Sequence, residues 1–414
     1  MRMSDRVKKI IFIIVFIGIT IFLGWLLYTF FINRPAVTPA PTGEAPIGGL
    51  PTAGTGTGRE PTVSVGGQLI PAGEVTTTTP PTTVSPTAQG GRTAVSLLTN
   101  QPGSGATISA DGSTLVYYQP SDGKFYRVTA DGTATALSDQ VFHNVETINW
   151  SSKKDKAILE YPDGANILYN FTTGKQITLP KHWEQFSFAP NNDQIAFKSM
   201  PLDPENRWLA VAKDDGSNIK LIEPLGKEEG AVANIDWSPN NQIIATYSKS
   251  EDLERTSLYF LGLNGENFRS TLVEGRDVRP VWSPKGDLIA YSAYASLSDL
   301  KPNMWVVVGR PDSLGSNRRN LELNTWADKC TFADNTTLYC AVPQYLPRGA
   351  GIVPAVADTI PDDFYRVDLN SGSKTLLAVP DGSYVADNLI VSGDGRYLYF
   401  TERLTGRLAK INLK

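Results

Sequence analysis

The pattern of apolar and polar positions changes character twice along this chain. Residues 10–32 are apolar almost throughout and carry no charge. Residues 33–92 are rich in Thr, Pro and Gly and contain few large apolar residues. From residue 93 onward, short segments rich in β-branched and aromatic residues alternate with turn residues, which predicts many short β-strands.

The first segment has the length of a transmembrane helix. Its 23 uncharged residues exceed the roughly 20 that a helix needs to cross a bilayer. Four basic residues precede it, namely Arg2, Arg6, Lys8 and Lys9. The positive-inside rule therefore places residues 1–9 in the cytoplasm and the rest of the chain outside, in the periplasm or at the cell surface. A cleaved signal peptide is the alternative, but its apolar region would be only about 7 to 15 residues long.

The second segment, residues 33–92, predicts a disordered stalk. It offers too little apolar surface to offset the entropy lost on ordering. A flexible coil of this length has an end-to-end distance of roughly 40 Å. We therefore expect a domain that is tethered to the membrane but held clear of it.

The remaining residues, 93–414, contain a repeated unit. Each copy has a strand ending in an aromatic or β-branched residue, a tight turn built from small residues with Pro, Asp, Asn or Gly, and a second strand. Most copies continue into a third and a fourth strand. The seven copies are Ile108–Tyr118, Trp150–Tyr161, Phe188–Ser199, Trp237–Ser248, Trp282–Ala293, Phe332–Val342 and Val391–Glu402. This arrangement predicts an all-β fold, a β-propeller with seven four-stranded blades.

The two ends of the repeat region complement each other. The last copy stops after its third strand, Arg407–Lys414, whereas Thr93–Asn100 matches the pattern of a fourth strand. We predict that this N-terminal strand closes the last blade and leaves the ring without an open edge.

Two of the turns resemble a known repeat. Trp237–Pro239 and Trp282–Pro284 read Trp-Ser-Pro, and each precedes a strand of the Ile-Ala-Tyr-Ser type and a downstream Leu-Tyr pair or Gly-containing turn. This pattern resembles the TolB-like propeller repeat, also called PD40 or WD40-like, over residues 93–414. The resemblance implies a propeller and a habit of binding proteins. Familiar members carry six blades beside a separate small domain, which this chain replaces with the stalk, so the TolB role in envelope import does not transfer.

Loop lengths favour one sector of the ring as a binding site. The loops between second and third strands lengthen toward the C-terminus and reach their maximum at Pro343–Asp363. Loops longer than about 12 to 15 residues are commonly functional. The candidate partner-binding residues in this loop are Tyr345, Leu346, Arg348, Ile352, Val353 and Ile360. The alternative is a loop that only folds over its own blade or plugs the channel.

The cysteines and histidines indicate structural roles. Cys330 and Cys340 flank a predicted hairpin turn and would face each other if the register pairs them. A disulfide is permitted outside the cytoplasm, and two buried free thiols are the alternative. The only two histidines, His143 and His182, are expected to be packed or hydrogen-bonded residues. This scarcity predicts no metal site, cofactor or Cys/His nucleophile.

Charge and motifs narrow the function classes further. The 38 basic and 42 acidic residues are nearly balanced, without the concentrated basic face that nucleic-acid binding needs. No Gly-x-Ser-x-Gly elbow of a hydrolase is present. We therefore predict a membrane-anchored module that binds an unidentified protein or peptide in the cell envelope, and no enzyme. The alternatives are a carbohydrate-active enzyme with paired carboxylates at the channel mouth, or a glycan or small-ligand binder that uses Trp183, Trp208, Trp305 and Trp326.

Overall fold

The computed structural model describes residues 16–23, 25, 62–65, 68–71, 83–227, 229–266 and 268–414. The chain separates into two compact units, Met1–Thr77 and Thr78–Lys414. In the first unit, residues 16–23 and 25 are helical. Most of the expected transmembrane helix lies outside the described residues. Within the described ranges, no helix is both long enough and apolar enough to cross a membrane.

The first unit also contains a β-hairpin inside the segment predicted as a disordered stalk. Strands β1 (Thr62–Val65) and β2 (Gln68–Pro71) pair in antiparallel fashion. The sequence explains this pairing, because β-branched residues and the dipeptide Gly-Gly are a short-range hairpin signal.

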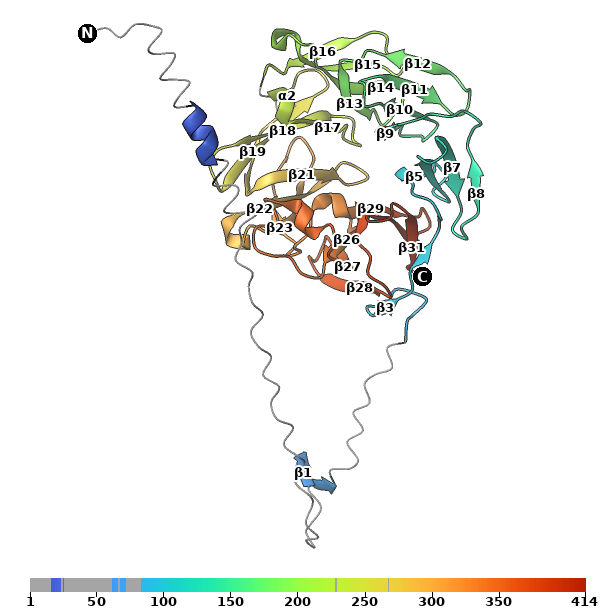
Figure 1. Ribbon diagram of the computed structural model, residues 1–414, viewed down its shortest axis with the longest axis vertical. Helices are drawn as coiled ribbons and strands as arrows, with labels where there is room; N and C mark the ends of the chain where they lie inside the picture. The colour runs from blue at the N-terminus through green and yellow to red at the C-terminus, as the bar shows by residue number, and fades with distance from the viewer. Residues whose placement is uncertain are drawn as a thin grey trace, which may run out of the picture. The chain divides into compact units, whose positions relative to one another are not determined.

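The second unit forms seven sheets in its described residues, which are the blades of a propeller (Figure 1). Blade one consists of β5 (Ser104–Ile108), β6 (Leu115–Gln119), β7 (Lys124–Val128) and β8 (Ala134–Ala136), and blade two of β9 (Thr147–Trp150), β10 (Lys156–Glu160), β11 (Asn166–Asn170) and β12 (Gln176–Leu179). Blade three consists of β13 (Trp183–Phe188), β14 (Gln194–Ser199), β15 (Trp208–Lys213) and β16 (Lys220–Pro224), and blade four of β17 (Ala233–Ile235), β18 (Ile243–Ser250), β19 (Arg255–Gly262) and β20 (Thr271–Glu274). Blade five consists of β21 (Arg276–Trp282), β22 (Leu288–Tyr294), β23 (Pro302–Val308) and β24 (Arg319–Asn320), and blade six of β25 (Cys330–Phe332), β26 (Thr337–Pro343), β27 (Asp362–Asp368) and β28 (Lys374–Pro380). Blade seven contains β29 (Ala386–Val391), β30 (Tyr397–Glu402) and β31 (Leu408–Asn412). The predicted all-β, seven-bladed propeller is thus confirmed.

The N-terminal segment of the domain joins two blades rather than one. β4 (Ser96–Leu97) pairs with β31 in the last blade, whereas β3 (Arg92–Thr93) pairs in parallel with β28 of blade six. The predicted continuous strand Thr93–Asn100 is therefore split. Asp381 accounts for the break, since its carboxylate accepts the Val95 N–H at 3.1 Å and its carbonyl accepts the Arg92 guanidinium at 3.0 Å. That this segment pins the ring shut stays a prediction.

Residues 83–91 also bond to the propeller, although the sequence placed them in the stalk. The Ala88 N–H donates to the Asn412 carbonyl at 2.8 Å, and the Gly90 N–H donates to the Leu377 carbonyl at 2.9 Å. Ala88 is buried beside the core of blades six and seven. Small residues in a Pro- and Gly-rich stretch give no periodic signal, so these contacts leave no trace in the composition.

The core lies between neighbouring blades. The second strand of a blade is covered on both faces, as in β14, where Ile195, Ala196 and Phe197 are fully buried. Trp237 of blade four belongs to the same buried cluster as Ala196 of blade three. The aromatic residue of the repeat therefore fills the space between blades, which explains its recurrence.

The serine of the repeat holds the first turn of a blade. The Ser238 hydroxyl donates to Asn240 Oδ1 at 2.6 Å and accepts the Ile243 N–H at 2.9 Å. Ser283 accepts the Leu288 N–H in the same way at 3.0 Å. These buried hydroxyls satisfy backbone donors that the turn leaves without partners.

Strand direction gives the propeller two distinct faces. The first-to-second turns of all seven blades and the third-to-fourth turns of blades one to six lie on one face. The opposite face, which we call the loop face, carries the connections between blades and the second-to-third loops 120–123, 161–165, 200–207, 251–254, 295–301, 344–361 and 403–407. All short helices of the described propeller lie in these loops and connections: η2 (Pro204–Asn206), α2 (Glu229–Val232), η3 (Ser296–Ser298), η4 (Ala327–Lys329) and η5 (Pro354–Ala357).

Candidate functional site

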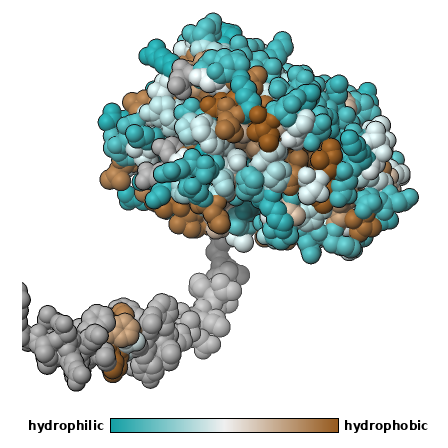
Figure 2. All heavy atoms as spheres, turned by 90° about the horizontal axis from the view of Figure 1, so that it is seen from above, coloured by the Kyte–Doolittle hydropathy of each residue, from teal (hydrophilic) through white to brown (hydrophobic). Residues whose placement is uncertain are grey.

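The loop face carries most of the large apolar side chains that are exposed in the propeller's loops. Leu202 and Leu297, in the loops of blades three and five, are 99% and 98% exposed. The other large apolar residues exposed in the loops, connections and short helices of this face are Val232, Leu253, Tyr345, Ile352, Val353, Val356 and Leu404. All of these residues lie on the loop face. Figure 2 shows apolar residues in separate patches among polar ones on the side that it presents.

Large apolar residues exposed elsewhere in the described propeller have a different setting. Val84 lies in the N-terminal segment, Leu97, Leu221 and Leu272 lie on outermost strands, and Ile219 lies in the third-to-fourth turn of blade three on the opposite face. Scattered apolar residues are normal on a protein surface, but a concentration of exposed apolar loop residues on one face over five successive blades is typical of an interaction surface.

The long loop 344–361 uses part of its apolar content to hold itself in place. Ile360 is only 4% exposed, and Leu346 packs against the buried residues Trp326, Ala350 and Ala357. These two predicted partner-binding residues therefore stabilise the loop. The remaining candidates are exposed, namely Tyr345, Arg348, Ile352 and Val353.

Backbone and ionic contacts fix the same loop on both sides. The N–H groups of Gly349 and Gly351 donate to carbonyls of residues 299 and 300 in blade five, at 2.9 and 2.8 Å. A Cβ atom at Gly351 would lie 2.4 Å from the Tyr294 side chain, so only glycine permits this approach. On the other side, Asp358 forms an ion pair with Arg403 of blade seven at 3.0 Å. The loop thus contacts three blades and is not limited to its own.

A buried ion pair lies where this loop enters β27. Lys329 Nζ lies 2.7 and 2.8 Å from the two carboxylate oxygens of Asp362, which is fully buried. Asp362 also accepts the Ala386 N–H of β29 at 2.8 Å. Burial raises the pKa of Asp362, and the Lys329 charge opposes this shift. The pair joins η4, the loop and blade seven.

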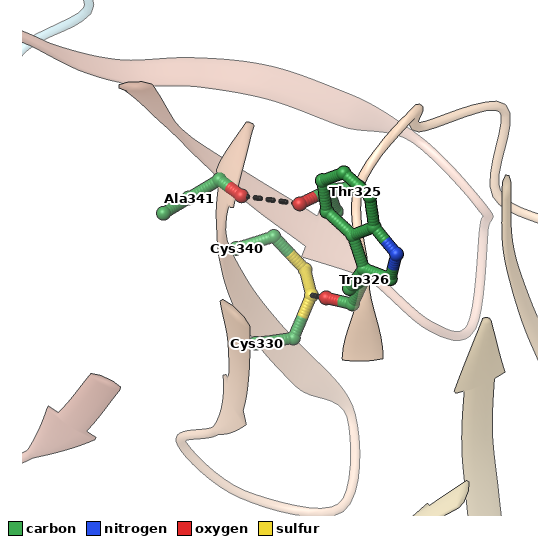
Figure 3. The surroundings of a disulfide bond; sticks show 5 residues. All are labelled: Thr325, Trp326, Cys330, Cys340 and Ala341. Carbon is green, nitrogen blue, oxygen red and sulfur yellow. Dashed lines mark hydrogen bonds between the residues drawn. A yellow bond between two sulfur atoms is a disulfide. The ribbon is translucent and has the colours of Figure 1, made fainter. Parts of the chain in front are cut away.

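The cysteines form a disulfide one residue beyond Lys329. Cys330 and Cys340 are direct partners in the register of β25 and β26, with Cα atoms 4.1 Å apart. Beside them, the Thr325 hydroxyl donates to the Ala341 carbonyl at 2.6 Å (Figure 3). The bond therefore ties together the first two strands of the blade that carries the long loop.

A cavity borders the candidate residues Tyr345 and Leu346. It has a volume of about 420 Å³ and is also lined by Lys301, Tyr365 and Lys374. The sequence brought Tyr345 into the candidate site, but the other lining residues come from different strands and only the fold assembles them.

Carboxylates gather at the inner edge of the loop face in blades two and three. Glu160, at the end of β10, accepts Asn149 Nδ2 at 2.7 Å and the Gln185 N–H at 3.3 Å. Burial raises the pKa of Glu160, and the charges of Glu184 and Glu146 contribute to the shift. A carboxyl group whose pKa is raised beside other carboxylates is a feature of acid–base sites.

The histidines and tryptophans are less prominent than the sequence suggested. Both histidines are exposed in connections between blades, so neither is a packed core residue; we expected packed or hydrogen-bonded side chains. Among the described residues, no group of three or more His, Cys, Asp or Glu side chains could hold a metal ion. Trp183 and Trp326 are buried, whereas Trp208 and Trp305 are half-buried.

Comparisons with known proteins identify the fold alone. No family model matches the sequence, and no curated protein matches it. An oligogalacturonate lyase from Vibrio parahaemolyticus is 11% identical with a TM-score of 0.51, over 77% of this chain and 93% of that one. An oligogalacturonate lyase in complex with manganese is 13% identical with a TM-score of 0.52, over 77% and 93%. The β-propeller domain of Cps50 (Swd1) from Myceliophteria thermophila is 11% identical with a TM-score of 0.52, over 77% and 100%. At such identities the likeness supports the propeller and carries no activity across.

Proposed function

We propose that this chain is a binding or scaffold module that captures a protein or peptide on its loop face. The observation that carries this proposal is the concentration of exposed apolar loop residues on that face. The long loop supports it, because buried contacts and an ion pair hold its backbone while four side chains stay exposed. A surface that is held in place loses little entropy when a partner binds.

We further propose that the module works outside the cytoplasm on an N-terminal membrane anchor. The uncharged segment 10–32 and the basic residues before it support this topology. The disulfide between Cys330 and Cys340 fits an oxidising compartment. The Trp-Ser-Pro turns at Trp237 and Trp282 support an origin of the blades in the TolB-like repeat.

Affinity capture with matched variants tests the binding function. The full chain in detergent is compared with a triple variant, Leu202→Ser, Tyr345→Ser and Ile352→Ser, after incubation with solubilised envelope proteins. The matched control is Ile219→Ser, Leu221→Ser and Leu272→Ser, which removes as many exposed apolar side chains from outside the loop face. We expect the loop-face variant to lose the captured proteins and the control to keep them. Equal capture by both variants would refute the proposal.

The second candidate function is glycan binding or glycan chemistry at the channel mouth. The observation that favours it is the raised pKa of Glu160 beside Glu146 and Glu184. Incubation with a panel of oligosaccharides, oligogalacturonate included, tests it by product release and by thermal shift. Activity or binding that disappears in Glu160→Gln would establish this function, and a panel without any effect would remove it.

A further inference from the structure

A groove of about 700 Å³ opens between blades four and five at the loop face. Its walls come from the loop 251–254 and the adjacent ends of β19 and β20 in blade four, and from β22, η3, β23 and β24 in blade five. Its volume falls in the range of about 300 to 1,000 Å³ that is usual for ligand pockets. The residues used below are Glu254, Arg255, Glu274, Ala293, Leu297 and Trp305.

One side of this blade four–five groove is apolar. Trp305 is half-buried, and its ring lies parallel to the ring of Tyr291 with centroids 6.4 Å apart. Ala293 is buried beneath the groove, and the nearly fully exposed Leu297 borders it. The indole is therefore held by the core while part of it stays open to a ligand. An open tryptophan ring attracts cations as well as apolar groups.

The other side of the groove is acidic. Glu254 accepts hydrogen bonds from the Ser296 hydroxyl and, at 3.0 Å, from the Ser296 N–H, which lower the pKa of its carboxyl. Glu274 is exposed in the register position opposite Arg255. The Arg255 guanidinium is bonded to Asp252 at 2.7 Å. A second guanidinium, that of Arg318, bonds to the Leu272 carbonyl of β20, and its charge opposes the rise in the pKa of Tyr291. Three carboxylates against two guanidinium groups still leave one excess negative charge on this side of the groove.

We propose that this groove binds a lysine or arginine side chain of the partner, together with an apolar residue next to it. The inference rests on the proposed binding function and deepens it. The cationic head lies between Glu254 and Glu274 and against the Trp305 ring, while the aliphatic part of the side chain covers Ala293. The neighbouring apolar residue contacts Leu297. Long cationic side chains combine an apolar stem with a charged end, which matches this division of the groove.

A positional library of fluorescein-labelled octapeptides tests the assignment with the full chain. One central position is fixed as each amino acid in turn, and a citrulline pool supplies a neutral isostere of arginine. Fluorescence polarisation is expected to select the Arg and Lys pools. Citrulline is expected to bind about threefold more weakly, as for a partly exposed ion pair. Glu254→Gln combined with Glu274→Gln removes this preference, and Trp305→Phe weakens the Arg pool by up to about tenfold.

The matched control is Glu266→Gln, whose carboxylate bonds to Asn264 in a turn on the opposite face. This variant is expected to bind the Arg pool like the unmodified chain. Thermal unfolding of each variant shows whether a loss of binding reflects a loss of folding. Selection of acidic or uncharged pools, an absence of selection, or Arg binding that survives both glutamine substitutions overturns the inference. Displacement of the Arg pool by oligogalacturonate, an anion, would assign the groove to glycans and overturn it as well.

The two tests fail in distinguishable ways, because the triple variant leaves all groove-lining residues intact. If the triple variant loses the captured envelope proteins and the double glutamine variant keeps them, the loop face binds the partner and the groove does not contribute. Capture that survives in both variants removes both.

Discussion

Replacing Lys329 by methionine should destabilise the propeller strongly. The two side chains of the Lys329–Asp362 pair are 9% and 0% exposed, so solvent does not compensate for a lost partner. The substitution removes both hydrogen bonds from Lys329 and leaves the carboxylate with the Ala386 N–H alone. Loss of one partner from such a pair costs about 3 to 5 kcal/mol. Urea unfolding of the full chain, followed by tryptophan fluorescence, measures the change in the free energy of unfolding.

The matched double variant separates charge burial from a packing defect. Asp362→Asn keeps an acceptor for the Ala386 N–H but removes the charge, so adding it to Lys329→Met should restore most of the stability. In Lys329→Met alone, burial raises the pKa of Asp362 without a cation to oppose it. The folded state then holds its proton more tightly than the unfolded state, so stability should fall as pH rises above about 4. A cost below about 1 kcal/mol at pH 7, or no recovery in the double variant, would contradict this reasoning.

Three further perturbations address other parts of the fold. Changing Cys330 and Cys340 to alanine removes a disulfide with a sequence separation of 10. The free energy of unfolding, measured with urea, should fall by about 2 to 3 kcal/mol. Equal stability of oxidised and reduced protein would count against this prediction. Leu98 lies in the buried cluster that joins the N-terminal segment to blades one and seven. If this segment closes the ring, Leu98→Ala should lower the free energy of unfolding by about 2 to 4 kcal/mol in the same assay. A cost near zero would argue against closure. Burial raises the pKa of Asp236 to about 7, so the stability of the folded state should fall as pH rises from about 4 to 7. Asp236→Asn should flatten this dependence, which thermal unfolding at several pH values measures. An unchanged slope would disprove the assignment.

The repeat was the most informative feature of the sequence. Its aromatic residue and its serine recur because one fills the space between blades and the other satisfies the turn, as Trp237 and Ser238 show. Local requirements of this kind repeat in every blade and can be counted without a structure. The blade number could therefore be predicted from the sequence.

Features that depend on neighbouring blades were beyond the sequence. Nothing local at Thr93 indicates that it pairs with blade six, and nothing at Ile360 distinguishes a buried anchor from an exposed contact. The blade four–five groove combines Trp305 with Glu254, which are adjacent only after two blades have packed. The exposed leucines of the loop face were detectable in principle, since Leu202 and Leu297 each lie among polar residues at matching positions of their repeats.

The double attachment of the N-terminal segment determines how the domain bears mechanical load. In the proposed membrane-anchored arrangement, a pull on the anchor would enter the domain at residues 83–97, whose backbone bonds to β28 of one blade and to β31 of the next. Tension would thereby be divided between two sheets. We expect such a propeller to keep its loop face in shape under this load, with rupture beginning at this segment.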